Sequence, residues 1–421
     1  MALGRVGAAT AGPAIASDDH LMAVWTNWIL FATLALWTAS GGSGGPGGGS
    51  TILPADPVKY VIYSLPLTLG AAYYLSYGGA RPPIDDRAFV ALAMYLALAV
   101  AGILINSWFG FFPYRDVFIV CSYLLLFVFW FRAPASIMDV ALGAVAACLA
   151  IEAAARIGPD VTLVDANGLY AILGLTIPSG NTVFGSHGIL ESTLGFPLGV
   201  IFLFYLHKRK WSLAAVAGML QLLAFKRITF AGVALAVAFD AVVSRNLRFG
   251  IARRLGCVLV VALSITAIFS TSIFQTSADF FQLRDSSANG ISLGRYDIAV
   301  MLWDRLDEAS TLNWLIGFGA GAADAVSQAV ADLNPHNDWL KILFDYGLLG
   351  TFVMHLIFFM ILTRHRLGLM IYIYTATLMV TDNIFIYMFY YPFIAMIMCV
   401  ESRQDIWRGS LCGTAATATR G

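Results

Sequence analysis

Apolar stretches of about 20 residues recur along nearly the whole chain, and a helix of that length crosses the hydrocarbon core of a bilayer. Strands of a membrane barrel would instead alternate apolar and polar residues in runs of about ten. Only 12% of the residues are charged, about half the share found in soluble domains. The sequence therefore predicts an all-α, polytopic integral membrane protein that forms a single transmembrane domain over residues 1–421.

The apolar stretches predict about 12 transmembrane helices. We expect them near residues 21–40, 58–77, 88–106, 115–132, 136–157, 188–206, 211–225, 228–243, 255–274, 338–362, 367–381 and 383–400. Two connections are much longer than the others: a first loop over residues 158–187, and a large loop over residues 275–337 between the ninth and tenth helices.

The distribution of basic residues predicts the orientation of these helices. If the N-terminus is inside, most of the 25 Lys and Arg residues lie in inner connections or on the termini. Both termini are therefore expected in the cytoplasm and both long loops outside, which is the periplasm if the cell is Gram-negative.

Neither a metal site nor a disulfide is indicated by the sequence. The five cysteines show no CxxC pair, and four of them lie in apolar stretches, where they are expected to pack. No HExxH or similar ligand spacing occurs. We expect no metal and no cofactor.

A basic dipeptide, Lys226-Arg227, lies between two apolar helices at the expected outer face. The guanidinium of an Arg presents donors that match a phosphate in a bidentate fashion. The alternative is an interfacial anchor that reaches toward lipid headgroups. Cations on this disfavoured side of a membrane usually have an anionic partner.

Two further arginines, Arg284 and Arg295, lie in the large outer loop. Arg295 opens a segment in which Ile298, Leu302 and Leu306 recur at helical spacing, which predicts an amphipathic surface helix. Arg295 is thus either a ligand for an anion or a solvated residue on the polar face of that helix.

His336 precedes an apolar helix, and Asn337 or Asp338 is suited to cap that helix. At the positive end of the helix dipole a neutral imidazole is favoured, and this is the form that a general base needs. A loop histidine without a task is the alternative.

Several other polar residues lie at the outer face or within apolar stretches. His187 and Glu191 are four residues apart and can form a contact at the top of a helix. Carboxylates in apolar segments are either functional or members of satisfied structural pairs; they are Glu152, Asp240 and Asp382. The glycines of residues 317–321 lack the Lys-Ser/Thr and the strand of a phosphate loop, so we expect a tightly packed turn there.

Three of these pieces occur in a fixed order. They are the basic dipeptide, then Gly294-Arg295 with Trp303, then Gly-x-Gly at 317–319 followed by His-Asn-x-x-Leu at 336–340 and Gly-x-x-Gly at 347–350. This order resembles the O-antigen ligase and polymerase family of bacterial membrane glycosyltransferases. The likeness covers about residues 211–362, and the His-Asn block is its most specific part.

The resemblance implies about twelve helices, a large outer loop over the catalytic cavity and metal-independent chemistry. It also implies a donor glycan on undecaprenyl diphosphate and, as acceptor, a growing glycan or lipid A–core. Arg227 and Arg295 would bind the diphosphate, and His336 would activate the acceptor hydroxyl. The residues expected to contact substrate around them are Lys226, Arg284, His187, Glu191, Asn337 and Asp338.

Ligases of this family commonly show Ser-Arg where this chain has Lys226-Arg227, which favours a polysaccharide polymerase over an O-antigen ligase. Membrane lipids are further expected partners, and nucleic acid is not. A secondary transporter would show two related halves with broken helices, and no such internal repeat is found. A non-catalytic assembly protein would need none of the outer-face His and Arg residues.

Overall fold

The structure is a computed structural model that describes residues 86–107, 136–156, 192–224, 226–280, 295–331 and 337–382, with single residues and short pieces of 117–124 and 384–401. Within these residues the chain is helical and contains no strand. The predicted helices at 21–40 and 58–77 lie outside the described residues, as does nearly all of the one at 115–132.

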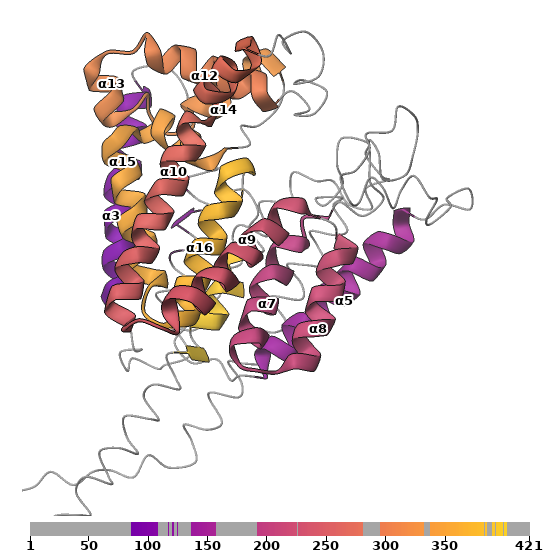
Figure 1. The fold of residues 1–421 in the computed structure, drawn as a ribbon. Coiled ribbons are helices and arrows are strands. Elements are labelled where there is room, and N and C mark those ends of the chain that lie inside the picture. The colour runs from indigo at the N-terminus through magenta and orange to yellow at the C-terminus, as the bar shows by residue number, and fades with distance from the viewer. Residues whose placement is uncertain are drawn as a thin grey trace, which may run out of the picture.

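Most of the described helices run along the long axis of one bundle (Figure 1). They closely match the predicted ranges, apart from α7, which begins seven residues later than expected, and α10, which is longer at both ends. They are α3 (Asp86–Ser107), α5 (Ile137–Arg156), α7 (Gly195–His207), α8 (Trp211–Ala224), α9 (Arg227–Phe239), η1 (Asp240–Ser244), α10 (Phe249–Phe280), α15 (Asp338–Leu362) and α16 (Arg366–Thr381).

Burial divides the bundle into central and peripheral helices. Helices α7 and α16 are apolar on every side, and nearly all of their residues are buried. These two helices therefore form the core. Peripheral helices instead expose large apolar side chains, such as Leu104 of α3, Met219 of α8 and Val258 of α10, each about two-thirds exposed. An apolar outer surface of this kind is expected where lipid is the solvent.

By length and apolar composition alone, three described segments are candidate membrane spans: Asp86–Ile105, Phe249–Phe269 and Asp338–Leu362, although the last of them is not straight. Five shorter apolar helices complete the described bundle. The described part of the chain is therefore helical, with segments long and apolar enough to cross a membrane, as the composition predicted.

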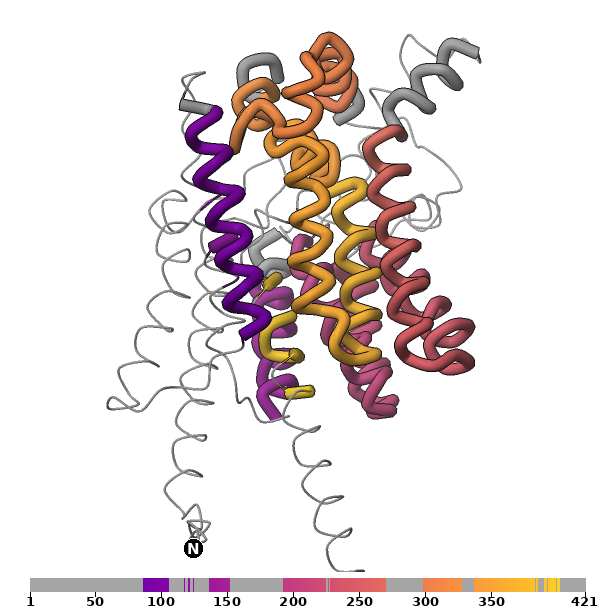
Figure 2. The backbone as a smooth tube through the Cα atoms, turned by 90° about the vertical axis from the view of Figure 1, so that its left-hand side faces the viewer, coloured from indigo at the N-terminus to yellow at the C-terminus, as the bar shows by residue number. Residues whose placement is uncertain are grey.

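A second layer of helices lies across one end of the bundle, which we call the upper end after Figures 1 and 2. It consists of α12 (Arg295–Asp307), α13 (Thr311–Ile316) and α14 (Ala322–Ala331). The predicted loop at 275–337 thus contains three helices. Its predicted amphipathic segment is confirmed as α12, since Ile298, Leu302 and Leu306 are all buried.

Helix α15 folds back on itself at Gly347. The Trp339 and His355 rings stack with their centroids 4.5 Å apart, although a straight helix would separate these residues by about 24 Å along its axis. Each ring lies eight residues from Gly347, the one non-helical position inside α15. Two arms therefore meet there: a short arm, residues 338–346, and a long arm, residues 348–362. The sequence predicted the ends of this helix but not its reversal.

Gly347 is required at the reversal for two reasons. Its φ of 66° lies in the left-handed region that side chains disfavour. A Cβ atom built there would also lie 2.5 Å from the carbonyl carbon of Leu315, so the backbone of α13 presses directly on the elbow.

We predict that Gly347→Ala destabilises the protein. A positive φ with an extended ψ costs about 1–3 kcal/mol with a side chain, and the contact with Leu315 adds to this. The measurement is the temperature at which the purified protein loses its helical circular dichroism in detergent.

Gly143→Ala on α5 is the matched control, because a Cβ there meets no atom within 4 Å. It is expected to unfold at the wild-type temperature or slightly above it. Equal behaviour of the two variants would contradict a strained elbow at Gly347.

Candidate functional site

The start of α9 is tied to the end of α16 by a buried ion pair. Lys226 is the residue before the first turn of α9, and Asp382 is the residue after the last turn of α16. The Lys226 Nζ lies 3.1 Å from an Asp382 carboxylate oxygen, and both residues are buried. The ammonium also lies 5.6 Å from the centre of the Phe196 ring of α7. Three helices are thereby joined at one charged centre.

This pair decides between the two readings of Asp382. A charge withdrawn from water is costly unless an opposite charge compensates it, and Lys226 provides that charge. Asp382 is therefore a member of a structural pair, and so is Asp240, which bonds Arg245 at 3.1 Å. The charge of Lys226 is already compensated by Asp382 within the protein. A contribution of Lys226 to substrate binding stays a prediction.

Arg227 follows this pair directly as the first residue of α9. The hydroxyl of Thr229 donates to the Lys226 carbonyl at 2.7 Å, which fixes the backbone of the turn in which Arg227 lies. The structure thus gives the position of Arg227 in the chain path, and its side chain lies outside the described part.

Asn337 anchors the beginning of the short arm. Its side-chain oxygen accepts a hydrogen bond from the Leu340 N–H at 3.0 Å, so the predicted cap is confirmed. Its side-chain nitrogen donates to the carbonyl of Ala267 on α10 at 2.8 Å. Asn337 thus uses both ends of its amide to hold the short arm against α10.

The next two residues connect the short arm to α16. The Trp339 indole N–H donates to the Ala376 carbonyl at 3.1 Å. Asp338 is fully buried and interacts electrostatically with the hydroxyl of Tyr391. Since Ala376 precedes Asp382 by six residues, or about 9 Å of helix, the starts of α9 and of the short arm attach to the last two turns of α16.

An aromatic cluster fills the space between these two attachments. The ring of Tyr390 lies 5.4 Å from that of Tyr391 and 6.4 Å from that of Phe196. Phe196 contacts Lys226, and the electrostatic influence of Asp338 reaches Tyr391, so the cluster connects the two charged positions. We take this region, bounded by Lys226, Asp382 and Asn337, as the candidate site.

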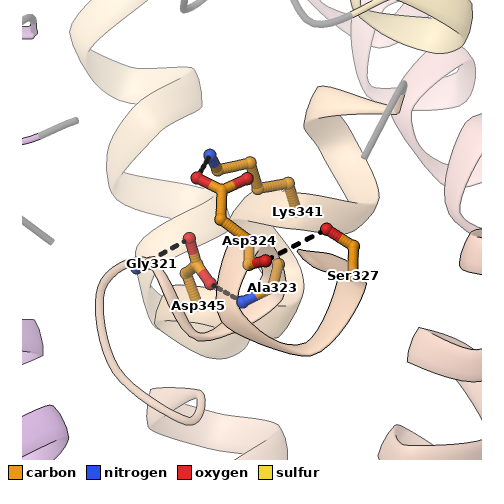
Figure 3. Close-up of polar contacts among 6 residues, drawn as sticks. All are labelled: Gly321, Ala323, Asp324, Ser327, Lys341 and Asp345. Carbon is orange, nitrogen blue, oxygen red and sulfur yellow. Dashed lines mark hydrogen bonds and ion pairs between the residues drawn. The ribbon is translucent and has the colours of Figure 1, made fainter. Parts of the chain in front are cut away.

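A second set of buried charges fastens the short arm to the upper layer (Figure 3). The Lys341 ammonium binds the carboxylate of Asp324 on α14. The carboxylate of Asp345 accepts hydrogen bonds from the N–H groups of Gly321 and Ala323, at 3.1 and 2.8 Å. A carboxylate at the start of a helix is favoured by the unsatisfied N–H groups there. These three residues hold the arm rigid on its upper side.

The glycine-rich segment before α14 is a packed turn, as expected. The N–H groups of Phe318 and Gly319 donate to the carbonyls of Phe344 and Asp345, at the end of the short arm. A Cβ on Gly317, whose φ is +79°, would lie 2.4 Å from the Asp345 carbonyl oxygen. The turn thus caps the short arm and has the backbone contacts of a structural element.

Sequence reasoning missed Lys341 and its partner. A Lys inside an apolar helix is a recognisable signal for a buried anionic partner. Asp345, four residues on, is the partner that helical spacing indicates. The structure pairs Lys341 with Asp324 instead, because Asp345 turns toward the backbone of α14.

Arg295 is the first residue of α12, in the upper layer. This helix packs on α10 through Trp303 and Phe269, whose ring centroids are 5.1 Å apart. Phe269 follows Ala267, the contact of Asn337, by two residues. The body of α12 therefore lies next to the anchored start of the short arm, while the Arg295 side chain is outside the described part.

The remaining predicted site residues, His336, Arg284, His187 and Glu191, lie outside the described residues. Among the residues that are described, no group of three or more His, Cys, Asp or Glu side chains is arranged to hold a metal ion. Comparison of the chain with family models, curated proteins and solved structures finds no match.

We predict that Asp382→Asn destabilises the protein by up to about 3–5 kcal/mol, since it leaves the buried Lys226 charge without its carboxylate. Unfolding by SDS, followed by circular dichroism, measures the change. The double variant Lys226→Met/Asp382→Leu should be more stable than Asp382→Asn, because it removes both charges.

Asp304→Asn is the control for this series, because Asp304 is exposed on α12. It should leave the unfolding curve unchanged. An Asp382→Asn curve that overlies the Asp304→Asn curve would show that the pair contributes nothing to stability.

Proposed function

We propose that this protein is a membrane glycosyltransferase that moves a glycan from undecaprenyl diphosphate to an acceptor hydroxyl at the outer face of the bacterial inner membrane. The observation that carries the proposal is the common attachment of the starts of α9 and of the short arm to the end of α16. It holds Lys226, the chain neighbour of Arg227, and Trp339, three residues after His336, on the last turns of α16. The backbones of Arg227 and of the residue that follows His336 are thus both held within the described part of the chain.

The described basic residues support the proposed orientation. At the lower end of the bundle they cluster in the connections α7–α8, η1–α10 and α15–α16, as Lys208, Arg209, Lys210, Arg245, Arg248, Arg364 and Arg366. The positive-inside rule assigns that end to the cytoplasm. The candidate site and the upper layer then face the periplasm, within a topology of about twelve helices with both termini inside.

In the proposed reaction, the acceptor oxygen attacks the anomeric carbon of the donor sugar. The bond from that carbon to the phosphate oxygen breaks, and undecaprenyl diphosphate leaves. His336 takes the proton of the acceptor hydroxyl, a contribution of about 10²–10⁴-fold. Arg227 and Arg295 bind the diphosphate and stabilise the negative charge that develops on it. A single displacement of this kind inverts the anomeric configuration.

The buried charges of the site have a different task in this mechanism. The Lys226–Asp382 pair fixes the turn that carries Arg227, and the two side-chain hydrogen bonds of Asn337 fix the backbone directly after His336. Reacting groups gain most when their backbones are held before substrate binds. The contacts of the short arm with α10, α14 and α16 hold its backbone in this way before substrate binds.

We predict that His336→Ala abolishes transfer in a reconstituted assay with a defined undecaprenyl-diphosphate-linked donor. Arg227→Lys and Arg295→Lys should each lower kcat/KM strongly, because Lys lacks the planar fork that binds two phosphate oxygens. The measurement is the rate at which radiolabelled glycan appears on the acceptor.

Arg254→Lys is the matched control: Arg254 is exposed near the lower end of α10, away from the site. It should transfer at the wild-type rate. Normal transfer by folded His336→Ala would remove His336 from the mechanism, and full activity of both site Lys variants would argue for simple charge attraction.

Two acceptors in the same assay separate the two members of the family. The Lys226-Arg227 dipeptide favours a polymerase, which extends a lipid-linked glycan by further repeat units. A ligase would instead transfer the glycan to lipid A–core. Transfer to neither acceptor by protein with a native unfolding profile would contradict the proposed function.

A further inference from the structure

Helix α13 presents an apolar face outward from the upper layer. Leu312 and Leu315 are 63% and 51% exposed, and their spacing of three residues places them on the same side of the helix. The opposite side of the segment packs on the elbow of α15, where the Leu315 backbone meets Gly347. Two large apolar side chains are thus held at the rim by a rigid contact beneath them.

This face continues the apolar outer surface of the bundle. Directly after the elbow, the long arm exposes Leu348, Leu349 and Phe352, each by half or more. On the neighbouring helix α3, Gly102 accepts a hydrogen bond from the N–H of Ala320, and Leu104 is 65% exposed. The membrane-facing surface of α3 therefore reaches the level of the turn that follows α13, and Figure 1 shows α13 above α3 and α15 at the edge of the bundle.

The residues just before α13 have the opposite character. Asp304, Arg305, Asp307 and Glu308 are all exposed at the end of α12. Four charges followed within a few residues by two exposed leucines mark a boundary between water and hydrocarbon. Amphipathic helices at such a boundary lie in the plane of the membrane with their apolar side toward the acyl chains.

We propose that α13 is an interfacial helix whose Leu312 and Leu315 side chains insert into the membrane leaflet on the side of the upper layer. The occupant of this face is lipid. Because α13 packs on Gly347, its insertion fixes the height of the elbow, and with it the short arm, relative to the membrane surface. The inference rests on exposed apolar surface and holds whether or not the chain transfers glycans.

Fluorescence quenching in nanodiscs tests this directly in the full chain. An environment-sensitive fluorescent amino acid is incorporated in place of Leu312 or of Leu315, with no other change. Replacement of Phe352, on the membrane-facing side of the long arm, is the lipid control, and replacement of Glu308 is the aqueous control. Each protein is measured with lipids brominated on their acyl chains and with iodide in the buffer.

We expect brominated lipid to quench the fluorophore at positions 312 and 315, as it does at the lipid control, position 352. Iodide should quench the fluorophore at the aqueous control, position 308, but not at positions 312 and 315. Iodide quenching at both positions would show that the face is in water. Protection from both quenchers would show that a protein surface covers it. Either of these results would overturn the proposal.

Discussion

The backbone contact between Gly347 and the α13 segment is the constraint on which the upper half of the molecule depends. It allows α15 to reverse within one residue, so that its 25 residues form two arms instead of one straight helix. The long arm lies along α3, whereas the short arm crosses from the elbow toward α10 and α16, where Asn337 and Trp339 make their hydrogen bonds. A helix that continued straight through residue 347 would remove both connections.

The short arm carries an unusual amount of buried charge for a membrane protein, and two of these charges have defined counterparts. Lys341 pairs with Asp324, and Asp345 receives two backbone N–H groups of the α14 start. Ionised groups in such surroundings are stable only while these partners are in place. The arm is therefore held from above by the upper layer, from one end by α10 and from one side by α16. Rigid support of this kind is what a site needs when reacting groups must be positioned before substrate arrives.

The sequence was sufficient for the helical membrane fold, for most helix boundaries, for the amphipathic α12 and for the Asn337 cap, because these follow from local spacing and composition. It also raised the pairing of Asp382 without naming Lys226 as the partner. The reversal at Gly347 was not predictable, since a single glycine in a helical segment does not by itself indicate a positive φ, and the backbone that lies against it belongs to α13, far earlier in the chain. The partner of Lys341 was not predictable for a similar reason. Helical spacing indicates Asp345, whereas the partner in the structure is Asp324 of α14. His355, for which local spacing indicates no partner, stacks on Trp339 and lies 3.0 Å from the Ser264 hydroxyl, and so joins the two arms to α10. The roles proposed for Arg227, Arg295 and His336 in transfer rest on the family resemblance and on the anchored positions of the neighbouring residues.

The most direct test of this account is a cysteine cross-link between residues 337 and 267. The double variant Asn337→Cys/Ala267→Cys is oxidised in native membranes and the bridged fraction is determined by mass spectrometry, with Asn337→Cys/Val260→Cys, about two helical turns lower on α10, as the control pair. The account predicts that the first pair is bridged and the control pair is not, because Asn337 lies against Ala267. An unbridged 337/267 pair whose residue 337 reacts with aqueous maleimide as fast as Glu308→Cys would place the start of the short arm away from the bundle, and the proposed site would then lose its geometry.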